Sequence, residues 1–364
     1  MTAASRTTTS NEAGSVPTLF RRLGESLAKS PQIGLIAVLV ALGIALTMAA
    51  GSHVDRLTGA TVNDFLNAHT LVQMATDASG FAIMGVGATI VIISGGIDLS
   101  VGAIYALAGV SMAMVLRTAG PMGDFATVLL GLATCLGVSL LCGLANGSMV
   151  IGLGVHPFII TLGTMWILRG VAFVVSHAQS ILVPQALTDV AKARLGIGAE
   201  LSPVPLLAML VVAFVGWTYL SRTVMGRHVF AIGGNAEASR YSGLAVPRIK
   251  LGVYLLSALT AGIAAFLGAA FYGSATSSDA NGYELYVIAS AVVGGASLTG
   301  GKGSAISAML GALLIVMIRQ AIRTLHLDQN YEWIIIGTAM IVAVVLDQSG
   351  TRLLNRRLTR AASS

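Results

Sequence analysis

Residues 125–151, FATVLLGLATCLGVSLLCGLANGSMVI, contain no lysine, arginine, aspartate or glutamate. Roughly 20 apolar residues in an α-helix cross the hydrocarbon core of a bilayer, and this run is long enough to do so. Similar runs recur along the whole chain of 364 residues, which is 55% hydrophobic and 10% charged. Because about 25% of the residues of a typical soluble domain are charged, the composition predicts an all-α, polytopic integral membrane protein.

Ten apolar runs are candidate membrane spans. They are 33–50, 70–93, 99–116, 125–151, 158–176, 203–221, 249–272, 284–298, 303–323 and 331–347. Small residues let helix backbones approach each other in lipid, so the 43 glycines of the chain fit such a bundle. Cys135 and Cys142 lie in one run, and we interpret them as packing residues rather than a metal or redox pair.

Basic residues concentrate in the N-terminal tail, in residues 222–250 and in the C-terminal tail. Cytoplasmic segments of membrane proteins accumulate lysine and arginine, so all three segments are expected on the cytoplasmic side. Six predicted spans separate the first segment from the second and four separate the second from the third, and even numbers are what a shared side requires. This placement explains the net charge of +6 without nucleic acid as a partner.

The same pattern predicts the domain organisation. We expect a disordered cytoplasmic tail over 1–32, a transmembrane domain over 33–348 and a basic cytoplasmic tail over 349–364.

Three stretches interrupt the helical pattern: Gly95-Gly96, His156-Pro157 and GGASLTGGKG at 294–303. Non-helical backbone survives at membrane depth only where protein or a water-filled cavity surrounds it. We therefore expect broken or re-entrant segments near 94–98 and 294–303. The six residues from Gly95 also resemble the six from Gly294, GGIDLS against GGASLT, which suggests an internal repeat.

Asp98 is the only charged side chain between Asp77 and Arg117. It follows two glycines and precedes helix-forming residues, where an N-cap carboxylate accepts a hydrogen bond from the free N–H of Ser100 or Val101. Ionisable residues inside membranes also mark transport pathways, so Asp98 is either a helix cap or a path residue. The two roles are compatible if the capped helix end faces a cavity.

Other polar side chains on the apolar runs fit either interhelical hydrogen bonds or a transport path. Glu284 begins the eighth predicted span and is either an interfacial acid or a group at the outer mouth of the path. Arg169 needs an acidic or carbonyl partner if it is buried, and the sequence identifies none. The candidate path residues are Ser94, Asp98, Ser100, Asn146, Thr161, Thr164, Glu284 and Ser297.

The basic segment 222–250 contains the signals of a short capped helix. Asn235 is a good N-cap, and Gly243 suits the position just after a helix end. Glu237 and Arg240 have the spacing of an i, i+3 pair, and Pro247 stands just before the next span. Because a helix of about two turns is not stable alone in water, we expect the segment to be held by a partner.

Four ordered stretches resemble the ribose, xylose and arabinose class of ABC importer permeases. They are SGGIDLSVGA at 94–103, HPFIITLGTMWILRG at 156–170, GRHVFAIGGNAEASRYSG at 226–243 and GYELYVIASAVVGGASLTGGKG at 282–303. Glu237-Ala238 followed by Gly243 is similar to the ATPase-coupling motif of such permeases, although Ser239 stands where a third small apolar residue is common. The resemblance covers roughly residues 70–348.

The resemblance implies a bacterial inner-membrane subunit with about ten helices, both termini cytoplasmic and two permease copies per transporter, identical or different. It also implies a cytoplasmic ABC ATPase and an extracytoplasmic sugar-binding protein as partners. The residues that would then engage the ATPase are Gly233, Gly234, Asn235, Glu237, Ala238, Arg240 and Gly243.

Nothing in the sequence provides an ATP site of its own. Gly300-Gly301-Lys302-Gly303 lacks the spacing and the strand context of a GxxxxGK[ST] loop. We therefore expect a monosaccharide transport subunit that is not an enzyme and binds no cofactor, with ATP used by the partner. The alternatives are a branched-chain amino-acid-type ABC permease and an ion-coupled secondary transporter that uses Asp98 as its proton or cation site.

Overall fold

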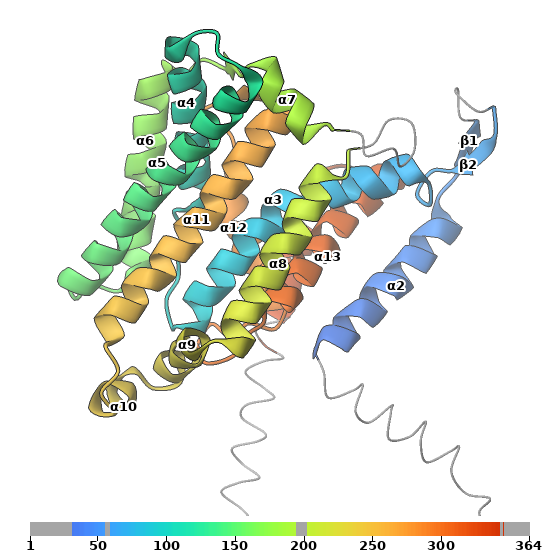
Figure 1. Cartoon of the computed structure of the whole chain (residues 1–364). Coiled ribbons are helices and arrows are strands. Elements are labelled where there is room, and N and C mark those ends of the chain that lie inside the picture. The colour runs from blue at the N-terminus through green and yellow to red at the C-terminus, as the bar shows by residue number, and fades with distance from the viewer. Residues whose placement is uncertain (1–30, 55–58, 194–201, 343–344, 346–364) are drawn as a thin grey trace, which may run out of the picture.

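The computed structural model describes residues 31–54, 59–193, 202–342 and Val345. The helices form one bundle whose long axes run between two ends (Figure 1). One end carries α9 (Val224–Gly234) and α10 (Ala236–Tyr241), and the opposite end carries the strands β3 (Ile181–Leu182) and β4 (Ser274–Ala275). We call them the α10 end and the β3–β4 end.

Eight helices of the described chain are long and apolar enough to cross a membrane. They are α2 (Pro31–Ala49), α3 (Ala68–Ile93), α4 (Val101–Ala119), α5 (Asp124–Gly152), α6 (Pro157–Ser176), α8 (Val204–Arg222), α11 (Val246–Tyr272) and α13 (Ala305–Thr324). Two shorter apolar helices are α12 (Tyr283–Val293) and Tyr331–Val342. Each predicted span overlaps one of these helices, so the all-α polytopic fold is confirmed. The tails predicted at 1–32 and 349–364 lie outside the described residues, except for Pro31 and Gln32, which begin α2.

Two small antiparallel pairs of strands accompany the bundle. β1 (Ser52–Val54) pairs with β2 (Thr61–Asn63), and β3 pairs with β4 so that Ile181 lies opposite Ala275. The second pair joins the chain after α6 to the end of α11, next to α7 (Gln185–Ala191) (Figure 1).

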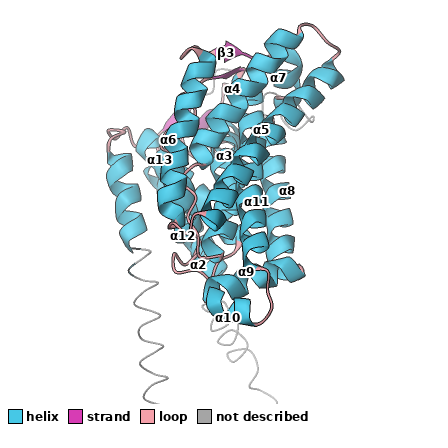
Figure 2. Cartoon of the chain, turned by 90° about the vertical axis from the view of Figure 1, so that its left-hand side faces the viewer, coloured by secondary structure: helices cyan, strands magenta, loops and turns pink. Residues whose placement is uncertain are grey.

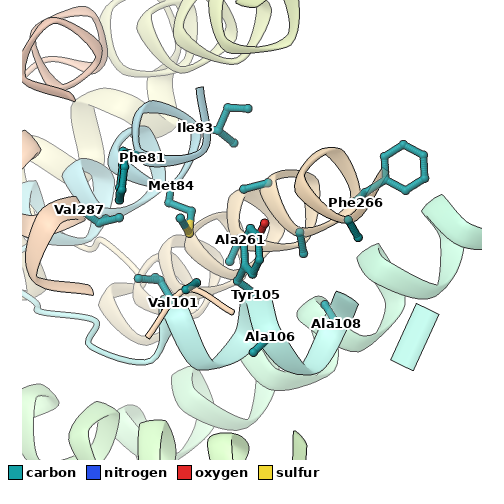
Figure 3. Close-up of a cluster of buried hydrophobic side chains, with 14 of the residues drawn as sticks. Phe81, Ile83, Met84, Val101, Tyr105, Ala106, Ala108, Ala261, Phe266 and Val287 are labelled. Carbon is teal, nitrogen blue, oxygen red and sulfur yellow. The ribbon is translucent and has the colours of Figure 1, made fainter. Parts of the chain in front are cut away.

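The core lies between α3, α4, α11 and α12. Figure 3 shows part of it, in which Phe81 and Met84 of α3, Tyr105 of α4, Ala261 of α11 and Val287 of α12 belong to one buried cluster. Burial decreases outward. In the most apolar 18-residue stretch of each helix, 83% of the residues are buried in α3 and 11% in α2. A peripheral surface that is this apolar suits a lipid surrounding.

Glycines bring the central helices close together, as their number led us to expect. A Cβ added to Gly87 of α3 would lie 2.9 Å from the Cα of Ser257 in α11. One added to Gly143 of α5 would lie 2.6 Å from the Cβ of Ala258. Both distances are too short for real side chains, so these contacts require glycine.

The predicted breaks after α3 and α12 begin with the same backbone cap. Each helix ends in a Schellman motif, in which two N–H groups beyond the helix donate to its last turn. The turning residue is Gly95 after α3, with φ of +78°, and Gly295 after α12, with φ of +92°. The predicted repeat is therefore present in the backbone, but its predicted register is wrong by one residue. The Schellman cap itself requires glycine only at the residue with positive φ, and Ser94 occupies the position of Gly294.

α12 is shorter than predicted. The predicted span 284–298 is wrong at its C-terminal end, because the helix ends at Val293. Its 11 residues rise about 16 Å, roughly half of the hydrocarbon core. Between β4 and α12 the chain enters the bundle without forming a helix. A Cβ added to Gly102 in the first turn of α4 would lie 2.6 Å from the carbonyl oxygen of Ala280. Residues 276–282 are therefore a non-helical segment inside the bundle, which continues into α12 and was not predicted from the sequence.

The segment 222–250 is more helical than predicted. Val224–Gly234 form α9, and α11 already begins at Val246. The side-chain oxygen of Thr223 accepts a hydrogen bond from Gly226 N at 3.0 Å and caps α9. Packing requires glycine at 226, since an added Cβ would lie 2.7 Å from the Cα of Leu220.

Candidate functional site

α10 begins and ends at the predicted residues. The Oδ1 of Asn235 accepts a hydrogen bond from Ala238 N at 2.9 Å. Gly243 has φ of +86°, and Leu244 N donates to the carbonyl of Ser239 at 3.1 Å, which closes the helix. The expected pair of Glu237 with Arg240 is wrong, since no salt bridge or hydrogen bond joins their side chains in the described structure.

Most of α10 is exposed at its end of the bundle (Figure 2). Glu237, Ala238 and Arg240 are exposed, and Tyr241 is 83% exposed. Ser239 is buried, so the position that departs from the coupling motif faces this chain itself. The caps and the neighbouring helices α9 and α11 hold α10 and leave its outer surface available to a partner.

Asp98 is buried and accepts three hydrogen bonds. Its Oδ1 accepts from Ser100 N at 3.0 Å and from Ser100 Oγ at 2.6 Å, and its Oδ2 accepts from Ser257 Oγ of α11 at 2.9 Å. Asn146 of α5 donates to Ser100 Oγ at 2.6 Å. The bond from Ser100 N was predicted, but the predicted N-cap position of Asp98 is wrong, because Ser100 is the N-cap of α4 and Asp98 lies two residues before it. The whole network joins α4, α5 and α11 at the start of α4.

The surroundings of this network contain unused polar atoms. The Oδ1 of Asn146 and the hydroxyl of Tyr254 are buried without a partner among the described residues. A Cβ added to Gly96 would lie 2.8 Å from that hydroxyl, so Tyr254 lies against the break. The hydroxyl of Thr161 in α6 donates to the carbonyl of Ile97 at 3.2 Å. Because buried polar groups are normally satisfied, this region can accept a further hydrogen-bonding group.

Arg169 is buried in α6 and forms hydrogen bonds with the non-helical segment 276–282. Its Nη1 donates to the carbonyls of Ser277 at 2.9 Å and Asp279 at 2.6 Å, and its Nη2 donates to that of Ala280 at 3.2 Å. These are the carbonyl partners that the sequence could not identify. Non-helical backbone inside the bundle is thus satisfied by one guanidinium.

Glu284 lies beside this guanidinium in the first turn of α12. A Cβ added to Gly102 would lie 2.7 Å from the Oε2 of Glu284 and 3.6 Å from the Nη2 of Arg169. The Oε2 is buried and accepts no hydrogen bond from the described residues. A carboxylate and a guanidinium therefore meet the first turn of α4 inside the bundle.

A protein family described as "Branched-chain amino acid transport system / permease component" matches residues 70–344, which is most of the chain. The chain belongs to this permease family. The matched region includes nearly all of α3, the Asp98 network, Arg169 and α10, whereas α2 precedes it.

Individual relatives of the permease match over most of its length. The D-allose transport system permease protein AlsC of Escherichia coli (strain K12) is 37% identical over 78% of this chain and 85% of its own. The ribose import permease protein RbsC of the same strain is 33% identical over 87% and 93%, respectively. The fructose import permease protein FrcC of Rhizobium meliloti is 30% identical over 91% and 89%. No solved structure matches the chain.

The remaining predicted path residues lie apart from the Asp98 network. The Ser94 and Thr164 hydroxyls donate to carbonyls of their own helical turns, those of Val91 at 2.7 Å and Thr161 at 3.2 Å. Ser297 lies in the loop between α12 and α13, where its N–H donates to the carbonyl of Lys302 at 3.1 Å. The permease thus gathers Asp98, Ser100, Asn146 and Thr161, and a role in transport stays a prediction for all of them.

A cavity lies toward the β3–β4 end of the permease, between α3, α4, α8, α11 and α12. Its lining includes Thr76, Asp77, Tyr105, Tyr272 and Tyr283. The hydroxyls of the three tyrosines form no hydrogen bond with the described residues. The cavity therefore presents unpaired hydroxyls next to a carboxylate and aromatic faces.

Neither this cavity nor Ser257 was predicted from the sequence. Ser257 carried a signal, because it and Thr260 stand one turn apart on an otherwise apolar helix. The tyrosines carried none, since aromatic side chains in apolar helices usually pack against their neighbours.

Replacing Arg169 with alanine should destabilise the permease. The carbonyls of Ser277 and Asp279 would lose the guanidinium that donates to them, and that of Ala280 would keep only Tyr283 N. A buried polar group left unsatisfied costs about 1–3 kcal/mol. We expect thermal unfolding of the purified protein in detergent to occur several degrees lower. Arg117→Ala is the matched control, because Arg117 is exposed and its guanidinium donates to Met114 Sδ. Overlaying melting curves for the two variants would contradict the structural role of Arg169.

Proposed function

We propose that this permease is the membrane-spanning subunit of an ABC importer that carries a monosaccharide into the cell. The observation that carries the proposal is α10, a capped and exposed helix on a bundle related to allose, ribose and fructose permeases. A separate ATPase docks on α10, and a binding protein delivers the sugar at the β3–β4 end. Two permease copies, identical or related, line the transporter.

The α10 end is cytoplasmic in this proposal. Four exposed arginines lie there: Arg222, Arg227, Arg240 and Arg248. α2 also begins on that side of the bundle (Figure 1). Basic residues accumulate on the cytoplasmic side of membrane proteins, which supports this orientation.

The groups that line the cavity toward the β3–β4 end suit a sugar as cargo, although the cavity, about 40 Å³ in volume, must widen to admit one. Tyrosine hydroxyls and the Asp77 carboxylate provide hydrogen-bond partners for a polyol, and aromatic faces provide apolar contact for its ring. The family description favours a second candidate, an amino-acid cargo. An amino acid would need a cation for its carboxylate, and the arginine nearest Asp77, Arg323, is already paired with it at 3.3 Å.

The proposal is tested by identifying the proteins that co-purify with the permease. Tagged permease, extracted gently from its native membrane, should co-purify with a stoichiometric ATPase. Tyr241→Ala should reduce that recovery severalfold, because it removes a large aromatic side chain of α10 that is 83% exposed. Tyr331→Ala is the matched control, since Tyr331 is 52% exposed and follows α13 at the opposite end.

A permease that is repeatedly recovered alone and moves solute in liposomes without ATP would contradict the proposal. That result would favour an ion-coupled secondary transporter, with Asp98 as the first candidate for its ion site.

A further inference from the structure

Three glycine pairs that are far apart in the sequence meet at one place. They are Gly95-Gly96 after α3, Gly233-Gly234 at the end of α9 and Gly300-Gly301 between α12 and α13. Gly301 N donates to the carbonyl of Ile93, the last residue of α3, at 2.9 Å. A Cβ added to Gly300 would lie 2.7 Å from the oxygen of Gly233 and 3.1 Å from the Cα of Gly95. We call this group of Ile93, Gly95, Gly233, Gly300 and Gly301 the glycine junction.

Gly233 lies directly against the hydrogen bond that joins the other two segments. A Cβ at this position would overlap the Ile93 oxygen and would lie 2.6 Å from Gly301 N. These two atoms are the acceptor and the donor of that bond. No side chain therefore separates α9 from the ends of α3 and of the α12–α13 loop, and the contact is made by backbone atoms.

The glycine junction adjoins each segment that the proposed transport cycle involves. On one side, Asn235, the N-cap residue of α10, follows Gly233 by two residues. On the second side, Ile93 leads through the break to Asp98 and the start of α4. On the third side, Gly301 leads into α13 and, across its loop, to α12. Side chains can change rotamer when a neighbour moves, whereas a backbone contact has no such freedom.

We propose that the glycine junction transmits a displacement of α10 to the breaks after α3 and α12, and that its glycines are positioning residues for transport. This inference rests on the proposed function, because it takes the ATPase to be what moves α10. A displacement of α9 shifts the Ile93–Gly301 bond directly. It thereby moves the segment that carries Asp98 together with the α12–α13 loop.

The test compares Gly233 of α9 with Gly252 of α11. Gly233→Ala places a methyl group against the glycine junction, whereas Gly252→Ala places one where nothing lies within 4 Å. Each variant replaces the permease in its native host, and uptake of D-ribose, D-allose and D-fructose is measured per mole of permease–ATPase complex. We expect Gly233→Ala to lower uptake about fivefold and to lower the number of sugars moved per ATP hydrolysed. Gly252→Ala should stay within twofold of the unchanged permease in both measurements.

A second pair of variants covers the case in which Gly233→Ala fails to fold. Gly300 and Gly154 have φ of +88° and +63°, so alanine is strained at both. A Cβ at Gly154 would meet nothing within 4 Å, whereas one at Gly300 would press on the glycine junction. We expect Gly300→Ala to lower the number of sugars moved per ATP severalfold and Gly154→Ala to leave it unchanged.

Two results would overturn the inference. One is equal uptake by Gly233→Ala and Gly252→Ala at equal amounts of complex. The other is a loss of complex in Gly233→Ala and Gly300→Ala while the number of sugars per ATP stays unchanged, which would make the glycine junction purely structural. If the unchanged permease recovered no ATPase, the proposed function itself would fail, and that result is separate from both.

Discussion

Asp98→Leu is expected to reduce sugar uptake to background. The substitution removes the acceptor of three hydrogen bonds, one from Ser100 N, one from Ser100 Oγ and one from Ser257 Oγ. A buried donor without an acceptor costs about 1–3 kcal/mol, and leucine also releases α4 from α11 at the point where α4 begins. Uptake per folded molecule, measured in membranes with equal amounts of permease, provides the readout.

Asp98→Asn is the matched control for this prediction. An amide oxygen can still accept from Ser100, and the amide nitrogen can donate to the Ser257 hydroxyl, which both donates and accepts. We expect this variant to retain most of its uptake. Equal loss in Asp98→Asn and Asp98→Leu would contradict a purely anchoring role and would show that transport needs the charge.

Gly243→Val is expected to abolish transport while the permease still inserts into the membrane. Gly243 has φ of +86°, and a β-branched side chain is strongly disfavoured there. Relief of that strain would open the end of α10, where Leu244 N donates to Ser239. We expect both ATPase recovery and uptake to fall to background.

Gly154→Val separates strain from coupling. Gly154 also has a positive φ, +63°, and a Cβ there would meet nothing within 4 Å, which is equally true of Gly243. The control should therefore carry a similar local strain away from α10 and retain its ATPase. If Gly243→Val took up sugar as well as Gly154→Val at equal expression, α10 would have no role in coupling.

The sequence was sufficient where structure depends on near neighbours. Asn235 and Ala238, and likewise Ser239 and Leu244, are three and five residues apart, so both ends of α10 could be predicted. The bond between Ser100 N and Asp98 spans two residues and was predicted for the same reason. The membrane spans followed from the same kind of local information, because each is a long and mostly apolar run.

Contacts between distant residues could not be predicted. Ser257 is 159 residues from Asp98, and the carbonyls bound by Arg169 are 108 to 111 residues away from it. The early end of α12 also depends on distant packing, because Gly294 lies against Ser307 of α13, where an added Cβ would come within 2.6 Å of its carbonyl carbon. One sequence, considered without its relatives, contains no direct information about such contacts.

The close approach of Gly233 to Ile93 has an evolutionary consequence. When two side chains touch, a change in one can be repaired by a complementary change in the other. The Ile93 atom involved is its carbonyl oxygen, which all amino acids share, so no replacement at 93 makes room for a methyl group at 233. A substitution of Gly233 therefore cannot be compensated by a second substitution at position 93.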